Sequence, residues 1–551
     1  MRYCSRAVTA TIPPLDPSAG LDATAVARWP VQAAAHLLGA ALVGAILVAL
    51  PAAPSDLDRH QLPKETVVHV ATWLAVVLAR PFARPASARG LVIAGSALVV
   101  WSLVSATAAV NPFLAVRAVA LTVTGLAALA TARRVAAAGH GVALVRWIVL
   151  AAVLAAGTGL AQAQGVDSVL FATARAPGGT LGNRNFLGHL MAIALPLAAW
   201  VALSAERGAR AVVAMLAIVP MVSMLVLTRS RAAWLAALAA GSVLGVAGWL
   251  AHRRGAVPVS RRRTIGVGVA MLAGIVAAIA IPNDLSWRSD APYAETLGSV
   301  ANYREGSGAG RLVQYRRSLR LLAEDPLRGV GPGNWPLRYG DVAPASDPSW
   351  AFNDDIPLNP WPSSDWVALA TERGIPGLLA GLGVGAMLLW AAWRGVRAGG
   401  DRGLAGATLA AVLAATLVAG LFDAVLLLAV PTLAVALAVG ALCWSSAPAP
   451  PSPDVSSRGV VSWLAAALLA LAAARSAQQT LAYAVAGDGR ARRELAWAAR
   501  IDPFSYPIRI ALARREPCRQ ARNDIRAALR LAPTWPAAQE AGRRCGLRRE
   551  E

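Results

Sequence analysis

Apolar segments of about 20 residues recur along almost the whole chain, and they constrain its fold more than any other feature. The 551 residues are 56% hydrophobic, with a mean hydropathy of +0.52. A water-soluble fold cannot bury so many segments of this length, whereas each can cross a bilayer as a helix. The sequence therefore predicts an all-α, polytopic integral membrane protein with about 12–13 transmembrane helices. The predicted segments are 31–50, 66–79, 91–110, 113–130, 143–164, 186–203, 211–228, 232–251, 264–281, 374–393, 403–422, 424–443 and 459–474.

The net charge of +22 follows the predicted loops and does not indicate nucleic-acid binding. With a cytoplasmic N-terminus, five successive cytoplasmic loops carry arginines, while the loop at 51–65 has mixed charges. This asymmetry is the positive-inside pattern of membrane proteins. It predicts that the polar stretch 282–362 and the C-terminal tail are both external. The loop arginines are Arg80, Arg84, Arg89, Arg133, Arg134, Arg207, Arg210, Arg253, Arg254, Arg261, Arg262, Arg263, Arg394, Arg397 and Arg402.

Composition divides the chain into seven parts. These are a flexible cytoplasmic leader (1–30), a first transmembrane block (31–281), a large external loop with an amphipathic helix (282–362), a second transmembrane block (363–443), a proline-rich linker (444–458), a last transmembrane helix (459–474) and a soluble helical tail (475–551). In the tail, Pro503 and Pro533 end two similar helical segments 30 residues apart, close to the tetratricopeptide period. An unrelated helical hairpin is the alternative. Cys518 and Cys545 can form a disulfide on the external side, or remain two free thiols.

Arg229 and Arg231 lie in a short turn that the topology places on the external side, where the positive-inside rule disfavours arginine. One interpretation is that they bind lipid headgroups with their charges at the membrane surface. The other is that the guanidinium fork binds the oxygens of a diphosphate. We favour diphosphate binding for Arg231.

Arg311 follows the glycine-rich segment 305–310 and is predicted to open a short amphipathic helix. A cation in the first turn opposes the helix dipole, so Arg311 does not serve helix stability there. Helix N-termini after glycine-rich loops bind phosphate through free N–H groups. The alternative is a helix that lies on anionic lipid, with Arg316, Arg317 and Arg320 at its rim.

Other polar and aromatic residues near the predicted external face are candidates for substrate binding. Asn183 and Asn185 suit sugar hydroxyls, although helix capping, most simply by Asn185, is the alternative. His189 is expected to be a satisfied interior histidine. Trp361 and Trp366 fit an interfacial aromatic belt or a sugar-stacking role. Asn334 lies in a turn-rich segment, while Asp365 and Glu372 are the carboxylates of the segment that leads back into the membrane.

Five short motifs occur in the order found in the O-antigen ligase and polymerase family, which the chain resembles over about residues 90–440. They are Gly182-Asn-Arg-Asn185, Thr228-Arg-Ser-Arg-Ala-Ala-Trp234, Gly310-Arg-Leu312, Gly329-Val-Gly-Pro-Gly-Asn334 and Glu372-Arg-Gly-Ile-Pro-Gly377. The resemblance implies a GT-C-like fold and places the two key arginines of the family at Arg231 and Arg311. Where the family often has a histidine, this chain has Ser363, and Asp365 is our candidate substitute among the catalytic residues.

The resemblance also implies a function. Such enzymes move a glycan from undecaprenyl diphosphate to an acceptor on the periplasmic side of the bacterial inner membrane. We expect an O-antigen ligase whose acceptor is lipid A-core, with chain polymerisation or protein O-glycosylation as alternatives and a lipid-linked oligosaccharide transporter as a different class. No cofactor and no metal are expected. Membrane lipid, and a protein at the helical tail, are the further expected partners.

Overall fold

The computed structural model describes residues 23–79, 89–171, 175–255, 259–287, 289–299, 302, 304–344, 347, 360–443 and 458–547. Most of the predicted leader and of the proline-rich linker therefore lies outside the described residues. Within the described ranges the chain forms helices and no strands.

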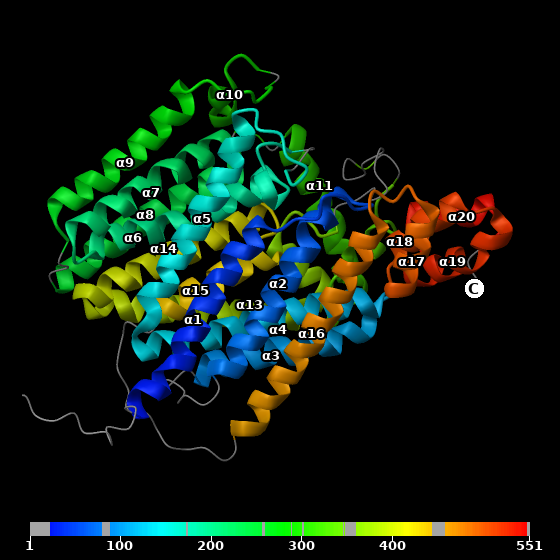
Figure 1. Cartoon of the computed structure of the whole chain (residues 1–551), viewed down its shortest axis with the longest axis horizontal. Coiled ribbons are helices and arrows are strands. Elements are labelled where there is room, and N and C mark those ends of the chain that lie inside the picture. The colour runs from blue at the N-terminus through cyan, green and yellow to red at the C-terminus, as the bar shows by residue number, and fades with distance from the viewer. Residues whose placement is uncertain are drawn as a thin grey trace, which may run out of the picture.

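Helices in the described residues cover most of each predicted apolar segment, in the predicted order (Figure 1). They are α1 (Ala23–Leu47), α2 (Asp56–Ala79), α3 (Arg89–Ser105), α4 (Pro112–Val135), α5 (Gly141–Ala163), α6 (Arg184–Ser204), α7 (Gly208–Leu227), α8 (Arg231–Arg254), α9 (Arg261–Ala280), α13 (Asp365–Ala398), α14 (Gly400–Phe422), α15 (Ala429–Leu442) and α16 (Arg458–Ala486). In the described chain, 10 stretches are long and apolar enough to span a membrane, and one of them, Pro112–Ala163, holds both α4 and α5. The prediction of an all-α polytopic membrane protein is confirmed.

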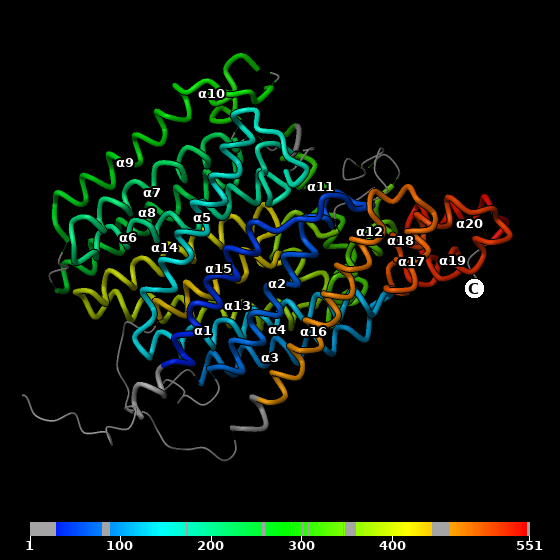
Figure 2. The backbone as a smooth tube through the Cα atoms, in the orientation of Figure 1, coloured from blue at the N-terminus to red at the C-terminus, as the bar shows by residue number. Residues whose placement is uncertain are grey.

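The largest differences from the predicted helix boundaries are at the start of α2 and the end of α16, because hydropathy does not register polar groups that are satisfied inside the protein. α2 begins at Asp56 and not near 66, since its charged first turns are buried in polar contacts. Lys64 Nζ, for example, donates to the carbonyls of Ala45, Ile46 and Val48 at 3.0, 3.2 and 2.5 Å, which are among the last carbonyls at the end of α1. α16 continues as one helix to Ala486, past the predicted end at 474, and leads directly into the tail (Figure 2).

The arginine-rich loops of the described chain lie together at one end of the helical bundle. Gly400 N donates to Gly255 O at 3.4 Å, and Arg263 donates to the carbonyl of Leu203 at 3.2 Å. At the other end lie α10 (Pro292–Gly298), α11 (Gly306–Glu324), α12 (Trp335–Tyr339) and the tail (Figure 1). This separation agrees with the alternation of loops that the charge pattern predicts.

The tail packs on the loop between α9 and α13, which contains α10, α11 and α12. Its helices are α17 (Arg492–Ile501), α18 (Tyr506–Arg515), α19 (Cys518–Leu531) and α20 (Pro536–Arg544). Buried Tyr506 and Trp535 share a hydrophobic cluster with Trp335 of α12, and Cys518 pairs with Cys545 in a disulfide. The tail is therefore held against the loop. Its relation to tetratricopeptide repeats stays a prediction.

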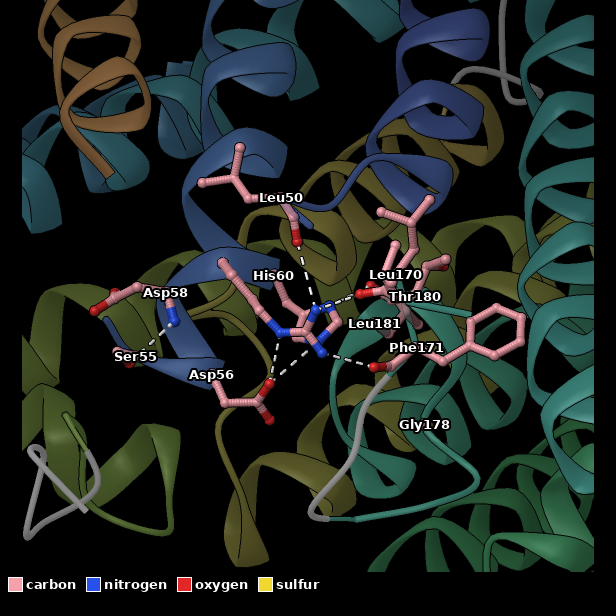
Figure 3. A network of polar contacts seen from close by, with 12 residues as sticks. Leu50, Ser55, Asp56, Asp58, His60, Leu170, Phe171, Gly178, Thr180 and Leu181 are labelled. Atoms are coloured by element: carbon pink, nitrogen blue, oxygen red, sulfur yellow. Dashed lines mark hydrogen bonds and ion pairs between the residues drawn. The ribbon is translucent and has the colours of Figure 1, made fainter. Parts of the chain in front are cut away.

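The start of α2 is fastened to the segment that leads into α6 (Figure 3). Arg59 donates to the carbonyls of Val169 and Phe171 at 2.5 and 2.7 Å, and also to Asp56 at 2.6 Å. His60 Nδ1 lies 3.0 Å from the carbonyl oxygen of Thr180. These contacts fix the N-terminal end of α2 against the residues that precede the N-terminus of α6.

Candidate active site

A cavity of about 1140 Å³ lies at the end of the bundle that carries α10 and α11, and it gathers the predicted site residues Arg229, Arg231 and Arg311. Its walls are the end of α5, the start of α6, the turn between α7 and α8, residues 284–302 and the start of α11. We name it the arginine cavity. Its charged lining residues are Arg175, Arg184, Arg229, Arg231 and Arg311, with Asp284, Glu295 and Glu305. Positive charge therefore exceeds negative charge in this lining.

The turn between α7 and α8 directs two arginines into the arginine cavity. Arg229 has a φ of 50°, a conformation that is strained for a residue with a side chain and that is found mostly at functional sites. Ser230 then caps α8 by accepting a hydrogen bond from Ala233 N at 3.4 Å. Arg231 is the first residue of α8, and its guanidinium donates to the carbonyl of Ser299 at 2.6 Å. A cation at this end of a helix is unfavourable by itself, so a bound anion would stabilise the arrangement.

Trp287 lies between two of the arginines and was not predicted as a site residue. The guanidinium of Arg184 is 5.2 Å from the centre of its indole ring, and that of Arg229 is 4.7 Å away. Arg229 also donates to Thr296 Oγ1 at 2.8 Å and to Glu295 at 3.0 Å. Trp287 therefore helps to fix both guanidinium groups through its negative ring face.

The phenol of Tyr293 in α10 lies close to Arg229. Burial raises the pKa of Tyr293 above its ordinary value, against the opposing effect of Arg229 and of a hydrogen bond from Asn283. The Tyr293 hydroxyl is therefore neutral and adds no negative charge beside the arginines.

Arg311 lines the arginine cavity from the second turn of α11, because this helix begins at Gly306. The prediction that Arg311 opens the helix was wrong: the glycines form the first turn and do not precede it as a loop. Within the described residues, the Arg311 guanidinium has no hydrogen-bond or ion-pair partner. Arg317, expected at a lipid-facing rim, instead forms an ion pair with buried Asp347.

Two residues of α11 hold the helix against the membrane block. The Gln314 side chain accepts a hydrogen bond from Ser363 N at 2.7 Å. The Tyr315 hydroxyl lies 2.5 Å from the carbonyl of Ser363 and 2.8 Å from that of Leu421. These contacts position Arg311 opposite the α7–α8 turn, and they occupy the backbone groups of Ser363.

The two predicted asparagines have different places. Asn183, and not Asn185, caps α6 by accepting from Asn185 N at 2.9 Å, so the simplest capping prediction was wrong. The Asn185 side chain lines the arginine cavity and donates to Asp423 at 3.0 Å. His189 is fully buried one turn further along α6, but its ring nitrogens have no hydrogen-bond partner in the described residues, contrary to the expectation of a satisfied histidine.

Asn334 and Glu372 lie apart from the arginine cavity and stabilise the turn-rich segment. Asn334 accepts from Asn111 N at 2.7 Å and donates to the carbonyls of Asn111 and Pro332 at 3.1 and 2.9 Å. Glu372 accepts from Gly333 N at 2.8 Å. Both side chains are buried, so these contacts fasten 329–334 to α4 and α13.

Asp365 also lies outside the arginine cavity. Its two carboxylate oxygens accept from the backbone N–H groups of Val425 and Leu426, each at 2.9 Å, and the side chain is buried. This carboxylate therefore holds the turn before α15, which explains why α15 begins at Ala429 and not at 424. Ser364 caps α13, accepting from Val367 N at 3.4 Å.

Trp361 lines a second, smaller cavity beneath the tail, together with Glu372. The structure thus brings together Asn185, Arg229, Arg231 and Arg311 of the predicted residues. It adds Arg175, Arg184, Trp287, Asp284 and Glu305, which sequence reasoning missed. Of these residues, only Arg184 could have been found from the sequence, because it lies inside the Gly182–Asn185 motif. In the described part of the chain, no three His, Cys, Asp or Glu side chains are grouped as metal ligands.

Residues 216–382 match the family model described as O-antigen ligase. The matched range includes the α7–α8 turn, α11 and the first half of α13, so it contains Arg229, Arg231 and Arg311. It supports membership of the family of O-antigen ligase- and polymerase-type membrane glycosyltransferases. No curated protein matches the chain.

Proposed function

We propose that this member of the O-antigen ligase-like family transfers a glycan from undecaprenyl diphosphate to an acceptor on the periplasmic side of the bacterial inner membrane. The activity that we favour is O-antigen ligation to lipid A-core. Chain polymerisation uses the same kind of glycan donor and is the second candidate.

The observation that carries this proposal is the excess of arginine in the cavity at the external end of the bundle. Arg175 and Arg229 lie close enough to Arg184 for their charges to repel it. Arg184 and Arg231 are also the first residues of two long helices, where the helix dipole adds positive potential. A diphosphate would relieve this repulsion, bind the guanidinium forks and accept hydrogen bonds from free helix N–H groups.

In the proposed reaction, an acceptor hydroxyl attacks the anomeric carbon of the donor sugar. A carbon–oxygen bond forms to the acceptor, the bond between the sugar and the diphosphate oxygen breaks, and undecaprenyl diphosphate leaves. Arg231 and Arg311 stabilise the negative charge that grows on the leaving diphosphate. Arginine remains protonated and cannot be the base. The carboxylates of Asp284 and Glu305 line the same cavity, and one of them is the proposed acceptor of the hydroxyl proton.

The periplasmic orientation is supported by two features of the external end. The tail packs on the loop that contributes α11, so both lie on one side of the membrane. The tail also contains the Cys518–Cys545 disulfide, and disulfides persist mainly outside the reducing cytoplasm.

The proposal is tested by glycan transfer in proteoliposomes that contain undecaprenyl diphosphate-linked glycan and lipid A-core. Arg231→Lys and Arg311→Lys keep the charge but lose the fork, and we expect each to slow transfer about 10–100-fold, as for a lost hydrogen bond to a charged group. Arg316→Lys, on the exposed face of α11, is the matched control and should transfer normally. Wild-type protein that consumes no lipid-linked glycan with any acceptor would overturn the proposal. Transfer only to a second lipid-linked glycan would favour polymerisation.

A further inference from the structure

A second cavity lies between the membrane block and the tail. Its volume is about 150 Å³, comparable with cavities that accept a six-membered ring. α2, α4, α13 and α16 form its walls, and α18 with Trp535 covers it. We name this cavity the tail chamber. Its lining includes Phe113, Trp361, Tyr506, Trp535 and the amide of Gln479.

The charges in the tail chamber are balanced, unlike those in the arginine cavity. Arg117 donates two hydrogen bonds to Glu65 at 2.8 and 2.7 Å. Arg475 donates to Asp502 at 2.8 Å, and Arg373 lies 3.6 Å from Glu372. An anion would have to compete with these carboxylates, so the tail chamber does not suit a phosphate.

The tail chamber suits a neutral ligand with hydroxyl groups. Its aromatic side chains give apolar walls for the C–H groups of a sugar ring, although Phe113 already stacks on Phe504 with ring centres 3.7 Å apart. The amide of Gln479 has no hydrogen-bond partner in the described residues and can both donate to and accept from hydroxyls. Apolar walls with a few polar groups are typical of small-molecule sites.

A thin wall of side chains separates the tail chamber from the arginine cavity. Asn185 lines the arginine cavity, and its neighbour Phe186 contacts Trp361, which lines the tail chamber, with ring centres 6.2 Å apart. A sugar in the tail chamber would therefore lie on the opposite side of this wall from a diphosphate-linked sugar.

The tail chamber continues into the membrane as an apolar crevice of about 230 Å³ between α3, α4, α13, α14 and α15. Leu121, Thr122, Arg373, Leu426 and Leu427 line both spaces, so the crevice begins where the tail chamber ends. The rest of its wall is mostly aliphatic or glycine, which suits a hydrocarbon chain. The exceptions are Asp365, Trp366, Thr416 and Thr432.

We propose that the tail chamber and the crevice together bind a neutral glycolipid, with its uncharged sugar in the tail chamber and its hydrocarbon chain in the crevice. The binding of such a glycolipid does not rest on the proposed function.

The test is photolabelling of the full chain in lipid nanodiscs by a dodecyl glucoside with a diazirine near its sugar. Gly385 lines the crevice, and a Cβ added there meets no atom within 4 Å, so Gly385→Leu narrows the crevice without a clash at Cβ. Gln479→Leu removes the free amide at similar volume. Gly245→Leu is the matched control, because Gly245 of α8 is exposed and equally open at Cβ.

We expect label on 113–122 and 475–483, with a loss of about fivefold or more in Gly385→Leu and in Gln479→Leu, and none in Gly245→Leu. Unlabelled dodecyl glucoside should compete, while free glucose and dodecyl phosphate should compete at least about tenfold more weakly. The proposal would be overturned if both variants were labelled as strongly as wild type, or if the label were spread over all helices. It would also be overturned if dodecyl phosphate competed as well as dodecyl glucoside. Labelling needs no glycosyl transfer. A protein that labels but never transfers would refute the proposed function alone, and one that transfers without this label would refute the glycolipid site alone.

Discussion

Replacement of Trp287 should weaken glycan-donor binding without removing any charge. The guanidinium groups of Arg184 and Arg229 lie 5.2 and 4.7 Å from the centre of its ring. Each such contact contributes about 0.5–1 kcal/mol at an exposed site, so the two together contribute about 1–2 kcal/mol. A difference of about 1.4 kcal/mol is tenfold in affinity, and Trp287→Leu should therefore raise the KM for the lipid-linked donor about 5–30-fold.

The assay is steady-state transfer in proteoliposomes with varied donor and saturating acceptor. Because Trp287 orients the arginines and does not contact the reacting atoms, kcat should change much less than the donor KM. Trp287→Phe keeps an aromatic face and should lie between wild type and Trp287→Leu. If the donor KM is unchanged in Trp287→Leu, Trp287 does not help Arg184 and Arg229 to bind the donor. A fall in activity matched by a fall in Tm and in folded protein would show a structural role alone.

Three further predictions concern residues and segments outside the arginine cavity. Asp365→Asn leaves one of two backbone N–H groups without its acceptor, so it should lower the free energy of unfolding by about 1–3 kcal/mol. A melting curve and the activity per folded molecule check this. Normal stability with lost activity would indicate a catalytic role for Asp365. Lys64→Met removes the cation that binds three carbonyls at the end of α1, so it should cost about 3 kcal/mol or more in stability, and an unchanged Tm would contradict the observed contacts. Alkaline-phosphatase fusions at about residues 340 and 500 should both be active, because the tail packs on the loop that is predicted to be external. Inactivity at both sites would reverse that topology, and activity at one site only would contradict the packing of the tail on the loop.

The order of the helices could be predicted because the membrane imposes one simple rule. A helix that crosses a bilayer needs about 20 apolar residues, and the apolar segments show it directly. This rule misses helical turns whose polar side chains form hydrogen bonds inside the protein. The start of α2 shows this, since Lys64 and Arg59 are buried against carbonyls that only the folded chain brings near them.

The arginines of the site could be predicted from topology, but their neighbours could not. Arg229 and Arg231 stood out because arginine is disfavoured on the external side. Trp287 and Asp284 gave no comparable signal, since their place depends on how the external loop folds over the α7–α8 turn. Asn334 and Asp365 carry the same polar groups as binding residues, and only their backbone partners show that they support turns.

The proposed function requires that the arginine cavity bind the diphosphate of the glycan donor. A cryo-electron microscopy map of the full chain with undecaprenyl diphosphate tests this binding. We expect diphosphate density within hydrogen-bond distance of the Arg231 and Arg311 guanidinium groups, and loss of this density in the Arg311→Lys protein. Diphosphate density in the tail chamber, or density in the arginine cavity that contacts neither arginine, would contradict diphosphate binding by Arg231 and Arg311.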